Sequence, residues 1–108
     1  MNLSNNNRLL IKQFFAGQPV KRAYLFGSYA RNEALANSDI DILVELDHSK
    51  PIGMKFLLYP SALEQLLHIK VDLVSTEGLS KHIQPFIDKD KILIYERANN
   101  IEYADVKC

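Results

Sequence analysis

The chain has 108 residues, and 47% of them are hydrophobic, which is enough for one modest core, so we expect a single domain over residues 1–108. Its 13 basic and 13 acidic residues cancel, and this balance gives no support for a DNA-binding surface. The lone cysteine, Cys108, excludes an internal disulfide. Because the first residues are polar and no apolar run reaches the length of a membrane span, we expect a cytoplasmic protein with no membrane partner.

The N-terminal third of the sequence predicts two helices around a strand. Residues 4–16 carry a broad apolar side after a polar cap, and Gly17 and Pro19 close the predicted helix. An apolar run over 20–26 predicts a strand. Helix-favouring residues follow over 29–36, so we expect the order helix, strand, tight turn, helix.

The turn at Gly27 and Ser28 has the features of a phosphate-binding loop. Glycine lets the backbone turn and approach a ligand closely. The N–H groups that open the following helix, its dipole and the Ser28 hydroxyl would then receive a phosphate. Arg31 lies about one helical turn further on, where its guanidinium can face the same anion. Taken alone, such a turn is also typical of an ordinary loop, and Arg31 could instead pair with Glu33.

Two carboxylates open the second predicted strand, which covers residues 39–46. Successive strand side chains point to opposite faces, so Asp39 and Asp41 share one side while Ile40 and Ile42 lie on the apolar side. Carboxylates roughly 7 Å apart along a strand repel each other unless a cation lies between them. Oxygen ligands of this kind suit Mg²⁺, which shares its remaining positions with substrate phosphates.

The second half of the sequence continues the alternation of strands and helices. Pro60 predicts a bend or a new helix start within the third helix. Residues 97–108 have a mixed polar composition that fits a tail. Alternating strands and helices indicate an α/β or α+β fold in which helices cover one face of a sheet. The predicted elements are a loop over 47–53, a helix over 54–67, a strand over 68–74, a helix over 79–87 and a strand over 92–95.

A third carboxylate, Asp72, lies on the predicted strand 68–74. Phosphoryl-type chemistry with two ions and an attacking hydroxyl needs more ligands than one Asp-x-Asp pair supplies. If this strand pairs beside the strand that carries Asp39 and Asp41, Asp72 reaches the same carboxylate face. We therefore expect the two strands to be neighbours.

The combination of these motifs resembles the minimal nucleotidyltransferases of the DNA polymerase beta superfamily. The resemblance rests on the Gly-Ser-x-Ala-Arg turn at 27–31, the Ser-Asp-Ile-Asp segment at 38–41 and the lone Asp72, and it covers about residues 21–96. More narrowly, the chain is similar to the antitoxin of HEPN/MNT toxin–antitoxin modules. Asn32 departs from the pattern, which usually has glycine there, but asparagine tolerates a left-handed backbone.

The resemblance implies a fold, a site and a reaction. The implied fold is a nucleotidyltransferase-like mixed sheet with helices packed on one face. The implied reaction is transfer of AMP from ATP, with two Mg²⁺ ions, to a hydroxyl of a HEPN ribonuclease toxin, its tyrosine being the expected acceptor. The residues carried over are Gly27, Ser28 and Arg31 for nucleotide binding, and Asp39, Asp41 and Asp72 as catalytic metal ligands.

Two other functions remain open at the level of sequence. The chain could be an antitoxin that blocks the toxin by contact alone, with its site irrelevant to neutralisation. It could also modify a small molecule, as aminoglycoside nucleotidyltransferases do, although that type has an additional helical domain that this chain lacks.

Overall fold

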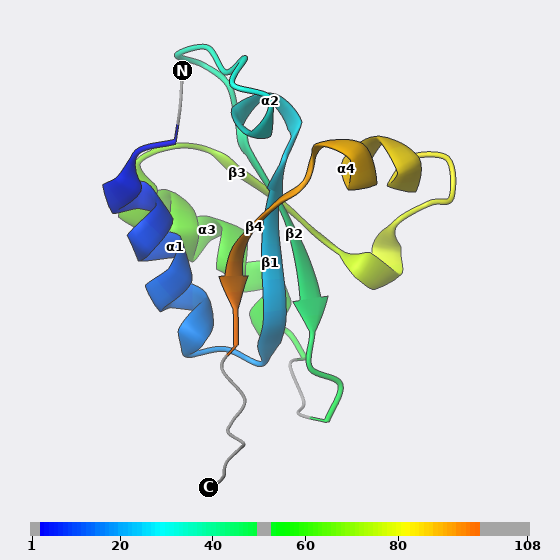
Figure 1. Cartoon of the computed structure of the whole chain (residues 1–108). Coiled ribbons are helices and arrows are strands. Elements are labelled where there is room, and N and C mark those ends of the chain that lie inside the picture. The colour runs from blue at the N-terminus through cyan, green and yellow to red at the C-terminus, as the bar shows by residue number, and fades with distance from the viewer. Residues whose placement is uncertain (1–2, 50–52, 98–108) are drawn as a thin grey trace, which may run out of the picture.

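In the computed structural model, which describes residues 3–49 and 53–97, four strands form one mixed sheet and helices flank it (Figure 1). In chain order the elements are α1 (Asn5–Ala16), β1 (Val20–Phe26), α2 (Gly27–Ala30), β2 (Ile40–Leu46), α3 (Lys55–Leu67), β3 (Val71–Ser75), the 3₁₀ turn η1 (Thr76–Gly78), α4 (Gln84–Asp90) and β4 (Ile92–Glu96). Residues 50–52 of the predicted loop and residues 98–108 of the predicted tail lie outside the described part of the chain.

The strands lie in the order β3-β2-β1-β4. β1 is antiparallel to both β2 and β4, whereas β2 and β3 are parallel. Figure 1 shows α1 and α3 packed together on one side of the sheet and α4 on the other side, beside α2. The predicted mixed α/β fold is confirmed, but the helices are not confined to the one face on which they were predicted, because α4 lies on the other. The expected pairing of the strand that carries Asp41 with the strand that carries Asp72 is also confirmed.

The main core lies between the sheet and the α1–α3 layer. Ser4 caps α1 by accepting a hydrogen bond from the Asn7 N–H, 3.0 Å away, so the first turn is fixed before the apolar side begins. On the α3 side, the Tyr59 ring makes edge contacts with Phe14 and Phe15. The largest fully buried side chains are Phe15, Ile11, Leu25, Ile40, Ile42, Leu43, Leu63, Val20 and Val44.

Strand β2 is buried on both sides, which its alternating pattern does not predict. Ile40, Ile42 and Val44 face the main core, as expected. Leu43 is also buried, with 1% of its surface exposed, although it lies on the carboxylate side and outside the main core cluster. Ile87 of α4 is buried in the same way. The middle of the second face is therefore covered, and only part of that face is left for a site.

Helix α3 runs through Pro60 without a break, so the predicted interruption there is wrong. Proline cannot donate a hydrogen bond to the preceding turn, which normally weakens a helix. Here the neighbouring Tyr59 is buried against the aromatic side chains of α1, and its hydroxyl donates to Gln18 Oε1 at 3.0 Å. Tertiary packing outweighs the local cost of the proline.

Helix α4 begins five residues later than predicted, at Gln84 instead of 79. Pro85 then falls in the first helical turn, where its missing N–H costs nothing because that group would have no helical partner. The prediction treated Pro85 as an interior residue and was wrong for that reason. Residues 76–83 form η1 and turns instead.

Helix α2 is also much shorter than the predicted helix over 29–36, because it ends at Ala30. Asn32 has a φ of 61°, in the left-handed region that an α-helix cannot include. The Glu33 N–H donates to the Ser28 carbonyl at 2.8 Å, the backbone bond that closes a Schellman helix end. Asn32 therefore adopts the left-handed conformation that ends the helix, for which glycine is the usual residue.

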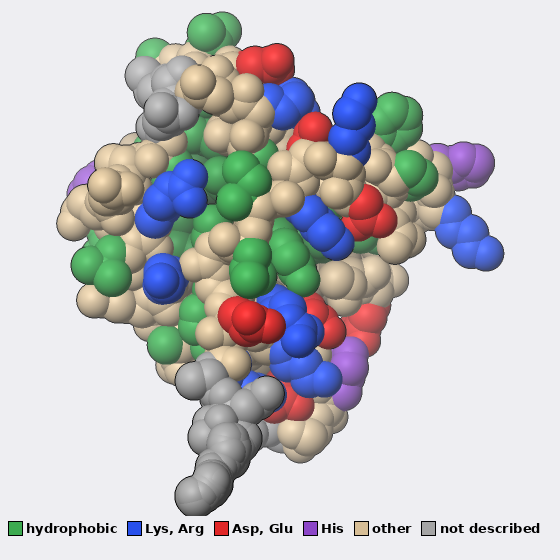
Figure 2. All heavy atoms as spheres, in the orientation of Figure 1, with side chains coloured by type: hydrophobic (Ala, Val, Ile, Leu, Met, Phe, Trp, Pro, Cys, Tyr) green, Lys and Arg blue, Asp and Glu red, His purple; other side chains and the backbone are tan. Residues whose placement is uncertain are grey.

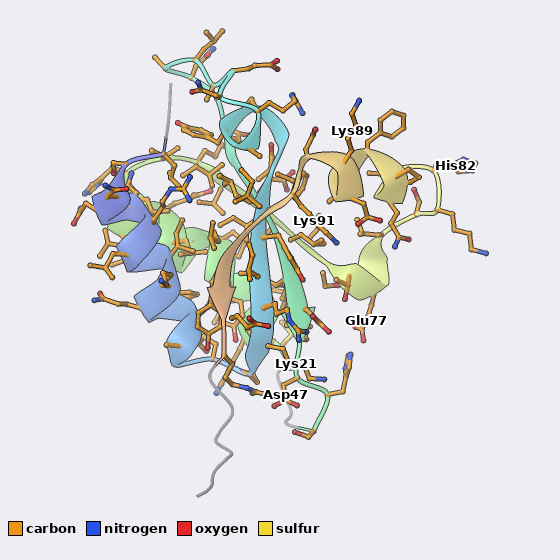
Figure 3. The ribbon with its side chains drawn as sticks, viewed as in Figure 1. Lys21, Asp47, Glu77, His82, Lys89 and Lys91 are labelled. Atoms are coloured by element: carbon orange, nitrogen blue, oxygen red, sulfur yellow. The ribbon has the colours of Figure 1, made fainter. Side chains whose placement is uncertain are left out.

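The far end of the sheet, away from α2, is closed by a buried carboxylate. Asp47 accepts hydrogen bonds from Ser49 Oγ at 2.6 Å and from Arg97 Nη1 at 2.7 Å (Figure 3). The hydrogen bond from Ser49, which has the largest effect, and the one from Arg97 hold the pKa of Asp47 well below its ordinary value. The pair joins the end of β2 to the end of β4 and fixes the edge of the sheet.

Surface charge agrees with the balanced composition. On the face in Figure 2, Lys and Arg side chains lie beside Asp and Glu, and they do not form a continuous basic surface. None of the helices in residues 3–49 and 53–97 combines the length and the apolar character needed to cross a bilayer.

We expect the stability of the α2 end to depend on the residue at position 32. Asn32→Ala should lower the free energy of unfolding by about 1 kcal/mol, because alanine is strained at positive φ, whereas Asn32→Gly should leave it unchanged or raise it. Urea unfolding measures both, with Asn37→Ala as a control at an exposed position without positive φ. Equal stability of the alanine and asparagine proteins would contradict the assignment.

Candidate active site

Gly27 brings the backbone of the turn directly against a carboxylate. Its φ is +74°, a conformation that other residues rarely adopt. Phe26, the preceding residue, is the cross-strand partner of Asp41 in the β1–β2 ladder. A side chain at position 27 would overlap Asp41 Oδ2 and lie 3.1 Å from Asp41 Cγ. The glycine is therefore required both by the backbone and by the space beside Asp41.

Asp41 and Asp72 are direct partners in the parallel pair of β2 and β3. Paired residues in neighbouring strands have backbones about 4.8 Å apart and side chains on the same face. The Ile40 N–H donates to the Lys70 carbonyl at 2.8 Å and fixes the two strand starts side by side. Asp39 lies one residue before β2. The backbone thus places all three predicted carboxylates at the same end of the sheet.

The electrostatics of Asp41 show that these groups are close. Its carboxyl is half-buried, and loss of solvation, followed by repulsion from Asp72 and then from Asp39, raises its pKa from 3.8 to about 6. Arg31 acts in the opposite direction and lowers this pKa. The site therefore holds more negative charge than its own cations compensate.

The chemistry of these donors fits Mg²⁺, which binds carboxylate oxygens and keeps several water ligands. No group of three or more His, Cys, Asp or Glu side chains in the described residues is already arranged around a metal position. Asp39 and Asp72 are exposed, so their side chains are free to rotate toward a cation. The feature that supports a cation is the half-buried Asp41 carboxyl, because burial and then the charges of Asp72 and Asp39 make its ionised form unfavourable.

The turn after β1 offers backbone and hydroxyl donors beside these carboxylates. The Ser28 hydroxyl has no hydrogen-bond partner within the described part of the chain, and the side chain is partly exposed. The predicted dipole of a helix over 29–36 is reduced, because α2 is a single turn. Local N–H and O–H donors are thus more important at this turn than a helix dipole.

Arg31 lies near the site but is engaged by two carboxylates. Its Nε donates to Glu33 Oε1 at 2.9 Å, and its Nη1 donates to Asp90 Oδ2 at 2.8 Å. Glu33 is the partner that the sequence offers for Arg31, whereas Asp90, 59 residues away, is not predicted. No sequence pattern marks that contact, because it depends on where α4 packs.

Comparison with known sequences identifies relatives over most of the chain. The family model for polymerase beta nucleotidyltransferases matches residues 10–100. A protein of Methanocaldococcus jannaschii with the provisional name protein adenylyltransferase is 45% identical over 76 residues, which cover 69% of this chain and 76% of that protein. The protein adenylyltransferase MntA of Thermococcus cleftensis is 36% identical over 75 residues, which cover 69% and 75% of the two chains.

Solved structures share the fold. A protein provisionally described as a minimal nucleotidyltransferase is 31% identical, with a TM-score of 0.69 over 81% of this chain and 88% of that chain. The complex of a tri-AMPylated Shewanella oneidensis HEPN toxin with its MNT antitoxin matches at 21% identity and a TM-score of 0.67, over 87% and 73%. A toxin–antitoxin structure with AMP-PNP matches at 24% identity and a TM-score of 0.68, over 86% and 74%. These last two likenesses show the fold alone.

Asp41 should destabilise the metal-free protein at neutral pH. The raised pKa means that the folded state binds the Asp41 proton more tightly than the unfolded state. Proton binding at Asp41 therefore stabilises the fold fully below about pH 3.8, and this contribution is lost as the pH rises to about 6. Asp41→Asn should therefore increase the free energy of unfolding at pH 7.5 by roughly 1 to 3 kcal/mol, with no gain at pH 3.5.

Urea unfolding in EDTA at the two pH values measures this difference. Asp88→Asn, an exposed substitution outside the site, is the control. A stabilisation by Asp41→Asn that is equal at both pH values would contradict the electrostatic origin.

Gly27→Ala should damage the site more than an ordinary glycine substitution does. The added methyl group displaces the Asp41 carboxylate, and positive φ adds about 1–2 kcal/mol of strain. Thermal unfolding and titration with MgATP measure stability and binding. Gly17→Ala is the matched control, because its φ is −93° and a Cβ there would have only an ordinary contact of 3.9 Å. If both variants behave alike, the close approach of residue 27 to Asp41 is not important.

Proposed function

Because the chain belongs to the polymerase beta nucleotidyltransferase family, we propose that it transfers AMP from MgATP to a tyrosine hydroxyl of a cognate HEPN-type toxin and thereby neutralises the toxin. One observation carries the catalytic part of this proposal. Asp41 and Asp72 lie side by side in β2 and β3, with the Gly27 turn against Asp41. This arrangement supports the proposal, because carboxylate oxygens suited to a metal ion lie next to backbone donors suited to a phosphate.

The turn would bind the leaving end of the nucleotide. Gly27 gives the phosphates access to the backbone, and the Ser28 hydroxyl adds a donor. The Arg31 guanidinium adds positive charge on the side of the site where α2 meets α4. These groups bind the β- and γ-phosphates, which leave together as pyrophosphate.

Asp39, Asp41 and Asp72 would hold Mg²⁺, and two ions fit the number of carboxylates. When bound, the metal supplies positive charge to the phosphate oxygens. The carboxylates in turn fix the position of the triphosphate relative to β2 and β3. Removal of Mg²⁺ should therefore abolish transfer.

The chemistry is an in-line displacement at the α-phosphorus. The acceptor hydroxyl loses its proton to a base, for which Asp72 is our candidate because it is exposed and adjacent to Asp41. The new oxygen–phosphorus bond forms as the bond to pyrophosphate breaks, so AMP ends on the acceptor. Positioning and charge neutralisation supply most of the catalysis in reactions of this type.

The acceptor in this proposal is another protein. Asp39 and Asp72 are exposed to solvent, so a hydroxyl from a second molecule can approach them. Two observations on relatives support a protein acceptor: the curated relatives are named protein adenylyltransferases, and a protein of the same fold is solved in complex with an AMPylated HEPN toxin. A nucleotide added to a tyrosine near the active site of the toxin would inactivate the toxin.

The test is an adduct assay with a HEPN-type protein that co-purifies with the chain. Incubation with MgATP should increase the mass of that protein by one or more adenylyl groups, as measured by intact mass spectrometry. Asp39→Asn with Asp41→Asn should reduce adduct formation by roughly 100-fold or more, because both substitutions remove metal-binding charge. Asp88→Asn, an exposed position outside the site, should have no effect.

The same variants separate transfer from neutralisation by contact. Loss of both the adduct and neutralisation, with association retained, supports the enzyme. Neutralisation that persists without an adduct would mean that the chain acts as a binding antitoxin. An unmodified partner under each of the four nucleoside triphosphates would refute the proposed reaction.

A further inference from the structure

Arg31 is clamped between two carboxylates from different parts of the fold. Glu33 belongs to the same turn, while Asp90 is the last residue of α4. The side chain of Asp90 is only 22% exposed, against 63% for Glu33, so Asp90 is the more fixed of the two partners. The position of the guanidinium is thus set largely by α4.

The end of α4 is itself anchored to the sheet on both sides of Asp90. Ile87 is buried, and its carbonyl accepts the Lys91 N–H at 2.8 Å. The Lys91 Nζ lies 4.8 Å from the centre of the Tyr24 ring on β1, and Figure 3 shows Lys91 directed toward β1 while Lys89 points away from the sheet. The neighbours of Asp90 therefore restrict how far its carboxylate can move.

The clamp leaves one end of the guanidinium available. Nε and Nη1 are engaged, whereas Nη2 has no hydrogen-bond partner within the described part of the chain. The charge of Arg31 also lowers the pKa of Asp41, so the guanidinium lies within electrostatic range of that carboxylate. A guanidinium held at Nε and at Nη1 still has the N–H groups of Nη2 to donate, and these are suited to bind a phosphate oxygen.

We propose that Asp90 is a positioning residue for nucleotide binding, which acts by fixing the Arg31 guanidinium with Nη2 free for the triphosphate. The inference rests on the proposed function, because it takes the phosphates to bind at the Gly27 turn. Its physical basis is preorganisation: a side chain already held in its binding geometry loses less entropy when the ligand binds. Asp90 does not touch the substrate.

Two other roles for Asp90 make different predictions. If Asp90 only joins α4 to α2, its removal lowers stability without changing nucleotide affinity. If Asp90 instead restrains Arg31 by neutralising its charge, its removal frees Arg31 and strengthens nucleotide binding. The positioning role predicts weaker binding only when the hydrogen-bond acceptor is lost.

The test compares Asp90→Ala with Asp90→Asn in MgATP titrations monitored by calorimetry. Alanine removes the acceptor, and we expect the Kd for MgATP to rise about three- to tenfold. Asparagine retains an oxygen that accepts from Nη1, so its Kd should stay within about twofold of the wild-type value. Thermal unfolding of each variant shows that the comparison is made on folded protein.

Asp88→Ala is the matched control, because it removes the same charge from α4 and also breaks one ion pair, with Lys91 Nζ at 2.9 Å, but has no contact to Arg31. It should leave the Kd unchanged. In an Arg31→Ala background, Asp90→Ala should have no further effect on the Kd, since Asp90 acts through Arg31. The Nη–H resonances of Arg31 should lose their protection from solvent exchange in Asp90→Ala and keep it in Asp88→Ala.

The outcomes separate this inference from the proposed function. A wild-type protein that binds no MgATP would overturn the proposed function and this inference with it. A wild-type protein that binds MgATP while Asp90→Ala binds equally well or more tightly would overturn the positioning role alone. An additional loss from Asp90→Ala in the Arg31→Ala background would show that Asp90 acts by another route.

Discussion

The structure depends on two like charges that the backbone forces together. Asp41 and Asp72 are partners in a parallel strand pair, and the register cannot change without moving the apolar side chains of β2 out of the core. Gly27 closes the space on the other side of Asp41. The carboxylate cannot relax away from its neighbours, and burial together with the charges of Asp72 and Asp39 raises its pKa. The main core supplies the stability that holds this unfavourable arrangement.

The opposite end of the same sheet face treats acidic residues differently. Glu45 and Glu96 lie on β2 and β4, and Arg22 on β1 bonds to both, at 2.7 and 2.8 Å. Each acidic side chain there has a cation built into the adjacent strand. Asp41 and Asp72 have no equivalent in the sheet, since the partner of Asp41 on β1 is Phe26. Within the sheet, Arg22 neutralises the acidic pair at the Glu45 end, whereas no strand residue neutralises Asp41 and Asp72. The negative charge at the Asp41 end is therefore available to bind a cation.

The sequence predicted the parts of this molecule that depend on local pattern. An apolar run located β1 and alternation located β2, and the acidic pair marked the end of the sheet where the three carboxylates meet. Asn32 was also interpreted correctly, because its tolerance of positive φ is a property of the residue itself. The errors arose where tertiary contacts decide. Pro60 is accommodated by the packing of Tyr59, and the start of α4 follows from where Pro85 can be placed at no cost.

The contact between Arg31 and Asp90 explains why sequence reasoning describes this site incompletely. A signature motif identifies the residues that lie near the ligand, but a guanidinium can point in many directions. In this fold its direction is set by a carboxylate at the end of a helix that has no motif and whose own position depends on a buried Ile87. The direction of the Arg31 side chain in this loop is thus set by a residue 59 positions further along the chain. The face of the sheet that carries Asp41 therefore has two roles. Leu43 and Ile87 are buried on this side, and the burial of Ile87 positions the end of α4 so that Asp90 reaches Arg31.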